Sequence, residues 1–380
     1  MMPADRGTVV VRWLAEPYGE ALERQIDRIA GLPDVRHVAV MPDVHQGKRV
    51  PNGIVVATER LVYPELIGVD IGCGISAVRF QATVDRFRQP DLRSILEELV
   101  AVVPTLKQPA AVARQHQPLI DGIGRLSCDR LARFANRDGR FQLGTLGRGN
   151  HFLELASDSQ GSVWAVVHTG SRAMGRHITS HYLNLASAAA GDLSSLDSNA
   201  PEGQAYLADM LWACRFATLS RQVILNRVAD ILERRFGIAM ALESFVDSPH
   251  NIGLRQVHRG QQLLVHRKSA NVATLDRQGL IAGSMLIGNH LVRGLGNPDS
   301  LHSSSHGAGR RLSRTEAAET LSTKDLGRTM RSVVWHDHWA HHLIDESPWA
   351  YRELHKVMAA QRDLVKTIDT LTPFLNDKRP

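Results

Sequence analysis

The sequence predicts a mixed α/β (α+β) fold in which a single compact domain, residues 1–380, has a β-sheet core surrounded by helices. Short apolar runs rich in Val and Ile predict buried strands at 38–41, 53–57, 163–168 and 263–268. Helical periodicity predicts helices at 18–29, 91–103, 174–190 and, as the longest, 205–236. No repeat, low-complexity tract or long linker divides the chain, and strands of both halves end in polar loops.

The remaining segments predict shorter elements around this core. Residues 9–13 indicate an edge strand, and the Arg-rich residues 106–140 are mainly helical. Two further helices are expected at 313–321 and 324–334. Ser347 and Pro348 are typical of a helix start, which predicts a final helix that continues to Leu371.

Composition excludes some classes of protein and leaves others open. The chain has 45 Lys and Arg against 39 Asp and Glu, a net charge of +6, which permits a phosphate-rich partner without requiring one. No apolar run approaches the roughly 20 residues of a membrane span. Three cysteines are too few for a disulfide framework and favour a reducing, cytoplasmic location.

The stretch 66–75 combines a carboxylate and a thiol in an apolar, strand-like setting. Asp70 and Cys73 are three residues apart, and Gly72 and Gly74 flank the cysteine, which suits a backbone that bends close to another group. A hard oxygen and a soft sulfur together select zinc, manganese, iron or cobalt. The alternative is a buried core cysteine at a strand end.

Several of the 18 histidines occupy strand or turn ends where metal ligands are typical. His151, His168 and His250 each adjoin Gly, Asn or Pro. If the Cys73 thiolate bridged two cations, Asp70 and His151 could hold one while His168 and His250 hold the other. Two-metal sites of this kind act on phosphoryl groups.

Other polar residues extend this hypothesis. Asp43 and His45 follow a buried strand, a typical place for site residues, although a turn cap is an equal alternative for both. His306 lies among small residues that leave its imidazole accessible, and a neutral imidazole can attack phosphorus. Four further histidines crowd into 336–342, and we interpret them as a surface or helix-end cluster without a catalytic role. The glycines of 143–154 do not have P-loop spacing.

Ordered motifs over most of the chain resemble the RtcB family of RNA ligases. They are Met41-Pro-Asp-Val-His-x-Gly47, Gly68-Val-Asp-Ile-Gly-Cys-Gly74, Gly144-Thr-Leu-Gly-x-Gly-Asn-His-Phe152, His168-x-Gly-Ser-Arg172, His266-Arg-Lys268, Gly283-Ser-Met285 and Ser305-His-Gly-Ala-Gly-Arg310. The resemblance implies joining of RNA 3′-phosphate or 2′,3′-cyclic phosphate ends to 5′-hydroxyl ends. It also implies GTP and two Mn²⁺ per chain as cofactors, a histidine–GMP intermediate, and RNA repair or tRNA splicing as the role.

Carried onto this sequence, the resemblance also implies roles for single residues. The implied metal ligands are Asp70, Cys73, His151, His168 and His250; the catalytic residues are His306 and Asp43; the nucleotide contacts are Asn150, Glu154, Asn251, Ser284, Gly307, Gly309 and Lys378; and the RNA contacts are Arg172 and Arg310. On this view the final helix places Lys378 beside the guanine. The alternative for Lys378 is a solvated tail.

The sequence departs from the family pattern at three positions near these motifs. Arg148 replaces a small residue, Ser269 a glycine and Ala282 a proline. These departures and the shorter 105–140 region resemble a subgroup associated with a release-factor-like protein, and an activating protein partner is possible. A metal-dependent phosphohydrolase or cyclic phosphodiesterase, or a non-catalytic RNA-binding relative, stays open as an alternative.

Overall fold

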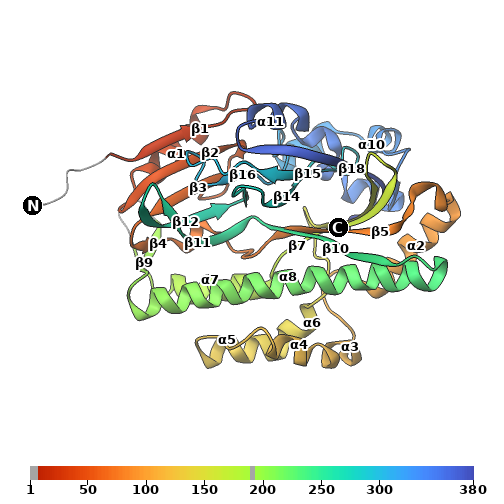
Figure 1. Cartoon of the computed structure of the whole chain (residues 1–380), viewed down its shortest axis with the longest axis horizontal. Helices are drawn as coiled ribbons and strands as arrows, with labels where there is room; N and C mark the ends of the chain where they lie inside the picture. The colour runs from red at the N-terminus through yellow and green to blue at the C-terminus, as the bar shows by residue number, and fades with distance from the viewer. Residues whose placement is uncertain (1–6, 189–192) are drawn as a thin grey trace, which may run out of the picture.

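The computed structural model describes residues 7–188 and 193–380, in which two curved sheets lie above a layer of helices (Figure 1). The larger sheet has the strand order β10-β5-β7-β6-β18-β15-β14, with β17 paired to β18. Its strands are β5 (Gly74–Thr83), β6 (Phe152–Ser157), β7 (Ser162–Thr169), β10 (Met240–Pro249), β14 (Gln278–Ala282), β15 (Asn289–Gly294), β17 (Val334–Trp335) and β18 (Val365–Asp377).

The second sheet has five strands in the order β1-β2-β3-β12-β11. They are β1 (Val9–Arg12), β2 (Val35–His45), β3 (Asn52–Thr58), β11 (Asn251–His258) and β12 (Gln261–Lys268). The predicted edge strand at 9–13 is therefore confirmed as β1, which pairs with β2 alone. β2 and β3 are buried almost throughout, as expected of continuous Val-rich runs.

A single long helix, α8 (Pro201–Phe236), lies along the larger sheet and confirms the prediction at 205–236 (Figure 1). Pro201 occupies the first helical turn, where its missing N–H is not needed, and Gly237 ends the helix with φ +67°. Together with α2 (Gln89–Val102), α8 packs apolar side chains such as Ile224, Val228 and Ile231 against the sheet.

A layer of short helices lies on the other side of α8 from the sheets (Figure 1). It consists of α3 (Ala110–Gln115), α4 (Gln117–Asp121), α5 (Asp129–Phe134), the π-helical turn η3 (Ala135–Gly139) and α6 (Arg140–Gln142). This confirms the helical prediction for 106–140. Trp212 and Phe216 of α8 share an apolar cluster with Ile120 and Leu143 of this layer.

The remaining elements complete the two sheets and their edges. They are α1 (Glu20–Ala30), β4 (Leu61–Val62), η1 (Pro64–Leu66), η2 (Val84–Arg86), α7 (Ala173–Leu183), β8 (Ser187–Ala188), β9 (Ser194–Asp197), β13 (Ala270–Val272), β16 (Ser303–Ser305), α9 (Arg314–Thr320), α10 (Thr323–Thr329), η4 (Asp337–His342), η5 (Ile344–Glu346), η6 (Pro348–Ala350) and α11 (Leu354–Ala360). Among the described residues, no helix is long and apolar enough to cross a membrane.

The predicted final helix to Leu371 is wrong. Only η6 and α11 are helical there, and residues 365–377 form β18, the strand that pairs with β6 and β15. Its β-branched and aromatic residues favour a strand, and both of its edges find partners. The helix predicted at 174–190 ends at Leu183, and residues 189–190 of that prediction lie outside the described part of the chain.

Candidate active site

The candidate ligand residues converge because four strands of the larger sheet end at one edge. Gly74 at the start of β5 pairs with both Thr169 of β7 and Pro249 of β10. Phe152 at the start of β6 pairs with His168. The sheet register brings four candidate ligands together, because each lies at or next to one of these paired positions: Cys73, His151, His168 and His250.

Two glycines in these loops permit very close approach. Gly72 has φ +71°, and a Cβ there would lie 2.7 Å from Cα of Cys214 in α8. A Cβ on Gly147, with φ +99°, would lie 2.3 Å from Nδ1 of His151. Gly72 therefore lets the Cys73 loop pack on α8, whereas Gly147 leaves room for a candidate ligand.

One buried arginine of α8 holds two of the ligand loops. Nη1 of Arg221, which is fully buried, donates to the carbonyls of Gly72 and Thr169 at 2.9 and 2.8 Å. Its Nη2 pairs with Asp247 at 2.8 Å. Gly72 precedes Cys73 and Thr169 follows His168, so the arginine fixes the backbone beside both side chains.

The five candidate ligands form one continuous cluster. Sγ of Cys73 lies 3.5 Å from Nε2 of His151 and 3.3 Å from Nε2 of His168. Nε2 of His168 lies 3.4 Å from Nε2 of His250, and Nε2 of His151 lies 3.2 Å from Oδ2 of Asp70. The thiol is thus at the centre, with Asp70 and His151 on one side and His168 and His250 on the other.

Burial controls the protonation of this cluster. Burial raises the pKa of the Cys73 thiol well above its ordinary value, and the Asp70 carboxylate raises it further. Burial and neighbouring imidazoles lower the pKa of His168 and of His250 well below the ordinary value. Burial alone would raise the pKa of Asp70, but the hydrogen bond and charge of His151 outweigh it and the pKa is lowered.

The donor set fits a transition metal. Sγ of Cys73 and the ring nitrogens of His151 and His168 lie within 4.8 Å of one another. Oδ1 of Asp70 and Nδ1 of His250 are buried without a hydrogen-bond partner. Neutral imidazoles, a carboxylate and a thiol that loses its proton on binding are the ligands such ions prefer.

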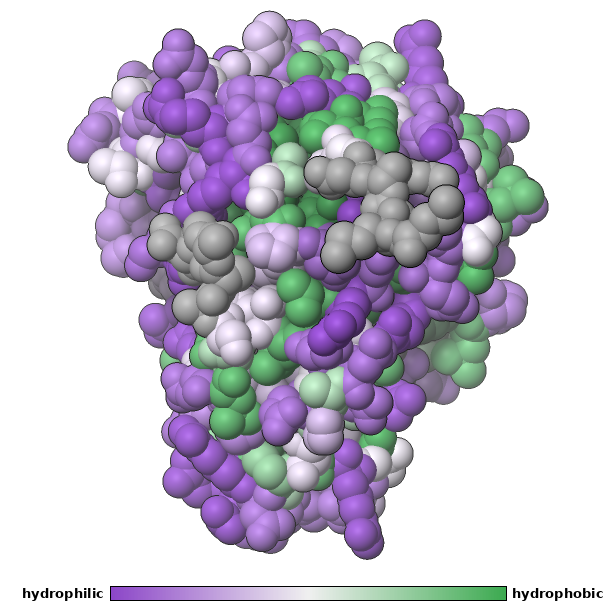
Figure 2. Space-filling view, turned by 90° about the vertical axis from the view of Figure 1, so that its left-hand side faces the viewer, coloured by the Kyte–Doolittle hydropathy of each residue, from purple (hydrophilic) through white to green (hydrophobic). Residues whose placement is uncertain are grey.

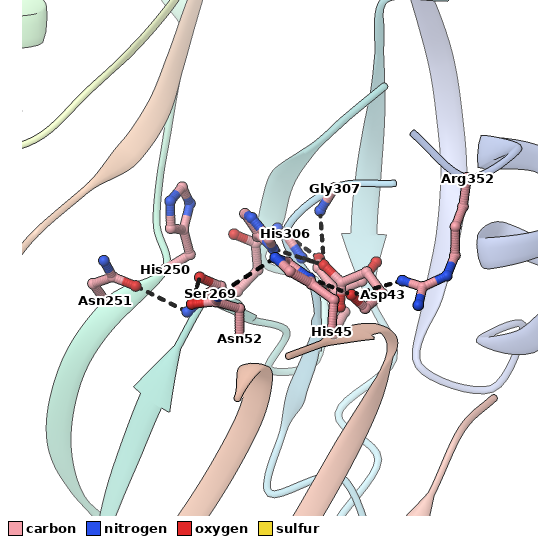
Figure 3. Close-up of polar contacts among 12 residues, drawn as sticks. Asp43, His45, Asn52, His250, Asn251, Ser269, His306, Gly307 and Arg352 are labelled. Carbon is pink, nitrogen blue, oxygen red and sulfur yellow. Dashed lines mark hydrogen bonds and ion pairs between the residues drawn. The ribbon is translucent and has the colours of Figure 1, made fainter. Parts of the chain in front are cut away.

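His306, which directly follows β16, lies beside His250 of the cluster and is oriented by Asp43 (Figure 3). Its ring centroid lies 4.8 Å from that of His250. Oδ2 of the fully buried Asp43 accepts from Nδ1 of His306 at 2.6 Å and from the backbone N–H groups of His306 and Gly307 at 3.2 Å. Because Nδ1 carries the proton, the Nε2 lone pair of a neutral His306 is free to act as a nucleophile.

A chain of hydrogen bonds within the five-stranded sheet supports Asp43 (Figure 3). Nδ1 of His45 donates to the Asp43 carbonyl at 3.0 Å, and Nδ2 of Asn52 donates to Nε2 of His45 at 3.2 Å. Nζ of Lys268 donates to Oδ1 of Asn52 at 3.1 Å. Burial lowers the pKa of His45 to about 4, which keeps the ring neutral as this chain requires.

A cavity of about 310 Å³ adjoins His306 and His168. Of the predicted nucleotide contacts, it is lined by Asn150, Glu154, Ser284, Gly307, Gly309 and Lys378. Gly309 has φ +70°, and a Cβ there would lie 2.4 Å from the Asp43 carbonyl oxygen. The volume of this cavity suits a small-molecule ligand.

Glu154 and Lys378 both line this cavity and are buried. Burial raises the pKa of Glu154 to about 8, and hydrogen bonds from Asn376 and Asn289 at 2.7 and 2.9 Å oppose that shift. Nζ of Lys378 pairs with Glu346 at 2.9 Å and lies 5.8 Å from the Phe152 ring. The solvated-tail alternative for Lys378 is therefore wrong.

The other predicted site residues make protein contacts. Asn251 donates to the Asp70 carbonyl and accepts from the Ser269 N–H, so its side chain braces a ligand loop. Nη1 of the half-buried Arg172 lies 3.2 Å from Nδ1 of His151. Arg310 lines the cavity but donates to the Asp345 carbonyl and pairs with Glu346.

The departures from the family pattern are also placed by the structure. Ser269 has φ +55°, the left-handed region that favours glycine, and Arg148 is exposed in the 147–149 loop. Ala282 ends β14, where its N–H donates to the His306 carbonyl.

We interpret the 336–342 histidines as a surface or helix-end cluster, and for His336, which directly precedes η4, only the surface alternative is wrong. His336 is buried, and its Nε2 lies 2.9 Å from Oδ1 of Asp377 in β18. Arg379 is also buried and donates to Asp377 and to the Val103 carbonyl. His338, His341 and His342 are not buried. His336 thus holds the strand end that precedes Lys378.

Comparison with known proteins identifies the family. A family model described as tRNA-splicing ligase RtcB matches residues 25–379. The chain belongs to the RtcB family. The RNA-splicing ligase RtcB of Escherichia coli K12 is 35% identical over 377 residues, which cover 92% of this chain and 91% of that protein. An RtcB of Mycobacterium bovis is 28% identical over 92% of the chain and 99% of its own, and the tRNA-splicing ligase RtcB of Thermococcus kodakarensis is 28% identical over 88% and 86%.

Within this RtcB chain, several cavity residues were not predicted from the sequence. They are Asn52, Phe152, Asn289, Glu346, Tyr351 and Asn376. His45 also lines the cavity, and its place beside Asp43 after a buried strand indicates a site residue. The others lie in the cavity because their strands pair with other strands, or because they lie in or next to short 3₁₀ turns. Spacing along the chain does not indicate these contacts.

Proposed function

We propose that this protein is an RNA ligase that joins a 3′-phosphate or 2′,3′-cyclic phosphate end to a 5′-hydroxyl end, with GTP and two Mn²⁺ ions. The observation that carries the proposal is the placement of His306 between a five-ligand cluster and a nucleotide-sized cavity, with its Nδ1 proton held by Asp43. Family membership and the names of the relatives support RNA as the substrate.

The metal ions would neutralise phosphate charge in the site, held by Asp70, Cys73 and His151 on one side and Cys73, His168 and His250 on the other. Nε2 of His306 attacks the α-phosphorus of GTP, the bond to the β-phosphate oxygen breaks and pyrophosphate leaves. An oxygen of the RNA 3′-phosphate then takes over the GMP group, and the 5′-hydroxyl displaces GMP to form the phosphodiester.

Asp43 keeps the proton on Nδ1 throughout, so Nε2 alone forms and releases the bond to phosphorus. Glu154, whose pKa is raised to about 8, and Lys378 would contact the guanine ring in the cavity. We propose that Arg172 and Arg310 contact RNA phosphates. We further propose that residues 1–380 act as one catalytic domain in the cytoplasm, where repair or splicing substrates occur.

A metal-dependent phosphohydrolase could use the same cluster and cavity, but it would not need His306 to hold GMP, so a requirement for GTP separates the two. The experiment is to incubate the purified protein with RNA that ends in 3′-phosphate and 5′-hydroxyl, with Mn²⁺ and with or without GTP. A joined product that requires GTP is expected. Release of inorganic phosphate or opening of a cyclic phosphate without any joining would contradict the ligase proposal.

A further inference from the structure

Most of the excess positive charge of the chain lies in the segment between β5 and β6. Residues 106–148 contain eight Lys or Arg and three Asp, a net charge of +5 against +6 for the whole chain. This segment includes the helical layer beneath α8 (Figure 1). Figure 2 shows that the lower end of the molecule, which this layer forms, is covered mainly by hydrophilic side chains. A concentration of one charge on one face indicates an anionic partner.

The arginines of this layer are arranged in a row. Arg130 and Arg133 of α5 and Arg137 of η3 follow one another at intervals of three and four residues, which places them on one helical face. All three side chains are exposed. Of these, Arg137 pairs with Asp138 at 2.5 Å, while no ion pair is formed by Arg130 or Arg133 among the described residues.

A second basic row on α7 meets the first. The ring of the exposed His177 in α7 lies 3.6 Å, centroid to centroid, from Phe134 at the end of α5. After burial, which is the main cause, the charges of Arg130, Arg137 and Arg176 lower the pKa of His177, and Asp138 opposes them. Three exposed arginines, from α5, η3 and α7, therefore lie near one aromatic pair.

The row on α7 begins at the metal-ligand cluster. Arg172 caps the first turn of α7, with its Nη1 3.2 Å from His151, and Arg176 follows one turn later. The amino-terminal end of α7, which carries the positive end of the helix dipole, lies at the same place. The exposed Arg148 is next to Gly147, whose Cβ position would be 2.4 Å from Nη1 of Arg172.

We infer that Arg130, Arg133, Arg137 and Arg176 form a track for the phosphate backbone of single-stranded RNA whose end enters the metal cluster. This inference rests on the proposed function, because RNA is the polyanion whose end the site would process. Guanidinium groups bind phosphate oxygens in bidentate geometry, and the His177–Phe134 pair offers an aromatic surface on which a base can stack. An acidic protein could also bind these arginines, but it would not explain why they lead to the metal-ligand cluster. Their position therefore favours RNA.

The test replaces the four track arginines together by glutamine, R130Q, R133Q, R137Q and R176Q, which keeps a polar side chain and removes the charge. The matched control is R277Q, R331Q, R362Q and K366Q, four exposed cations without an ion pair in the described structure. Binding of a short RNA with a 3′-hydroxyl end, which cannot be activated, is measured with Mn²⁺ and without GTP at several salt concentrations. Protein labelling by α-labelled GTP is measured in parallel.

The track variant should bind this RNA on the order of tenfold or more weakly at low salt. The slope of log K against log salt should fall by about 2 to 3, since each single-strand phosphate contact contributes roughly 0.7. Labelling by GTP and the melting temperature should match those of the control. An unchanged affinity and salt slope, in a variant that is still labelled by GTP, would overturn the track. Absence of labelling in the unsubstituted protein would instead contradict the proposed function.

Discussion

Asp43 and His306 form the contact on which the proposed chemistry depends. The carboxylate accepts from Nδ1 of His306 at 2.6 Å and is fully buried, so water does not compete for that proton. The backbone N–H of Gly307 donates to the Asp43 carboxylate, and Gly309 and Gly53 approach Asp43 so closely that a Cβ on either would clash with it. These contacts fix the position of Asp43.

Asp43→Asn should slow guanylylation on the order of 100-fold or more, because an amide stabilises the required tautomer of His306 much less than a carboxylate does. The rate is measured by single-turnover labelling with GTP. Metal content is the internal control and should be unchanged, since Asp43 does not contact the cluster. A labelling rate close to that of the unsubstituted protein would show that Asp43 does not orient the nucleophile.

Cys73→Ala should lower the Mn²⁺ content from two ions to less than one, because Sγ of Cys73 lies between both halves of the ligand cluster. Cys214→Ala, which removes another buried thiol nearby on α8, is the matched control and should keep both ions. Metal is measured by elemental analysis after gel filtration. Two ions retained by Cys73→Ala would rule out a bridging thiolate.

Glu154 should make stability fall as pH rises. Its pKa is about 8 in the folded protein and near 4.5 in the unfolded chain, so the folded state binds more protons between these values. The free energy of unfolding should therefore decrease through this range by up to about 1.4 kcal/mol per pH unit from this group. Glu154→Gln removes the group, so its stability relative to the unsubstituted protein should rise from pH 5 to pH 8 in denaturant titrations. A constant difference between the two proteins would contradict the raised pKa.

At the scale of elements, β18 decides how the chain end reaches the site. The strand pairs with β6 through Asn376 and Glu154, and this pairing places Asn376 against the Glu154 carboxylate. Asp377, held by His336 and Arg379, then fixes the backbone before Lys378. The sequence suggested a helix to Leu371, whereas the structure has a strand that is followed by the buried Arg379.

Arg379→Met should destabilise the protein on the order of 3 kcal/mol, because it removes one partner of a buried ion pair. It should also raise the GTP concentration needed for half-maximal labelling, since Lys378 is adjacent. Deletion of Pro380 alone, which is exposed, is the control and should change neither quantity. Denaturant unfolding and GTP titration measure the two effects. A stability equal to that of the Pro380 deletion would show that the Arg379 contacts contribute nothing.

Elements with a strong local pattern could be predicted from the sequence, and those set by pairing could not. The caps at Pro201 and Gly237 and the buried runs of β3 and β7 are local features. Residues 365–377 have no clean alternation, because a bulge lies between Pro373 and Leu375, and their strand state depends on β6 and β15. Asp70, Cys73 and the three histidines could be selected by their glycine-rich surroundings, whereas Asn289 and Asn376 became recognisable only through the Glu154 contact.

At the scale of the whole molecule, α8 connects the chemistry with the basic layer. Its Arg221 holds the loops of Cys73 and His168, and its opposite face, through Trp212 and Phe216, packs on the layer that carries the track arginines. The active site and the proposed RNA surface therefore share one rigid support. No stretch of sequence indicates this arrangement, because it depends on contacts between residues 52 and 149 positions apart.

The central claim is that His306 becomes covalently bound to GMP. The most direct measurement is incubation with α-labelled GTP and Mn²⁺, followed by denaturation and detection of label on the protein, for the unsubstituted chain and for His306→Gln. The account predicts labelled protein that is stable to alkali and labile to acid, as a phosphoramidate is, and no label on His306→Gln with metal content unchanged. Undiminished labelling of His306→Gln, or no labelling of the unsubstituted protein with both metal ions bound, would contradict it.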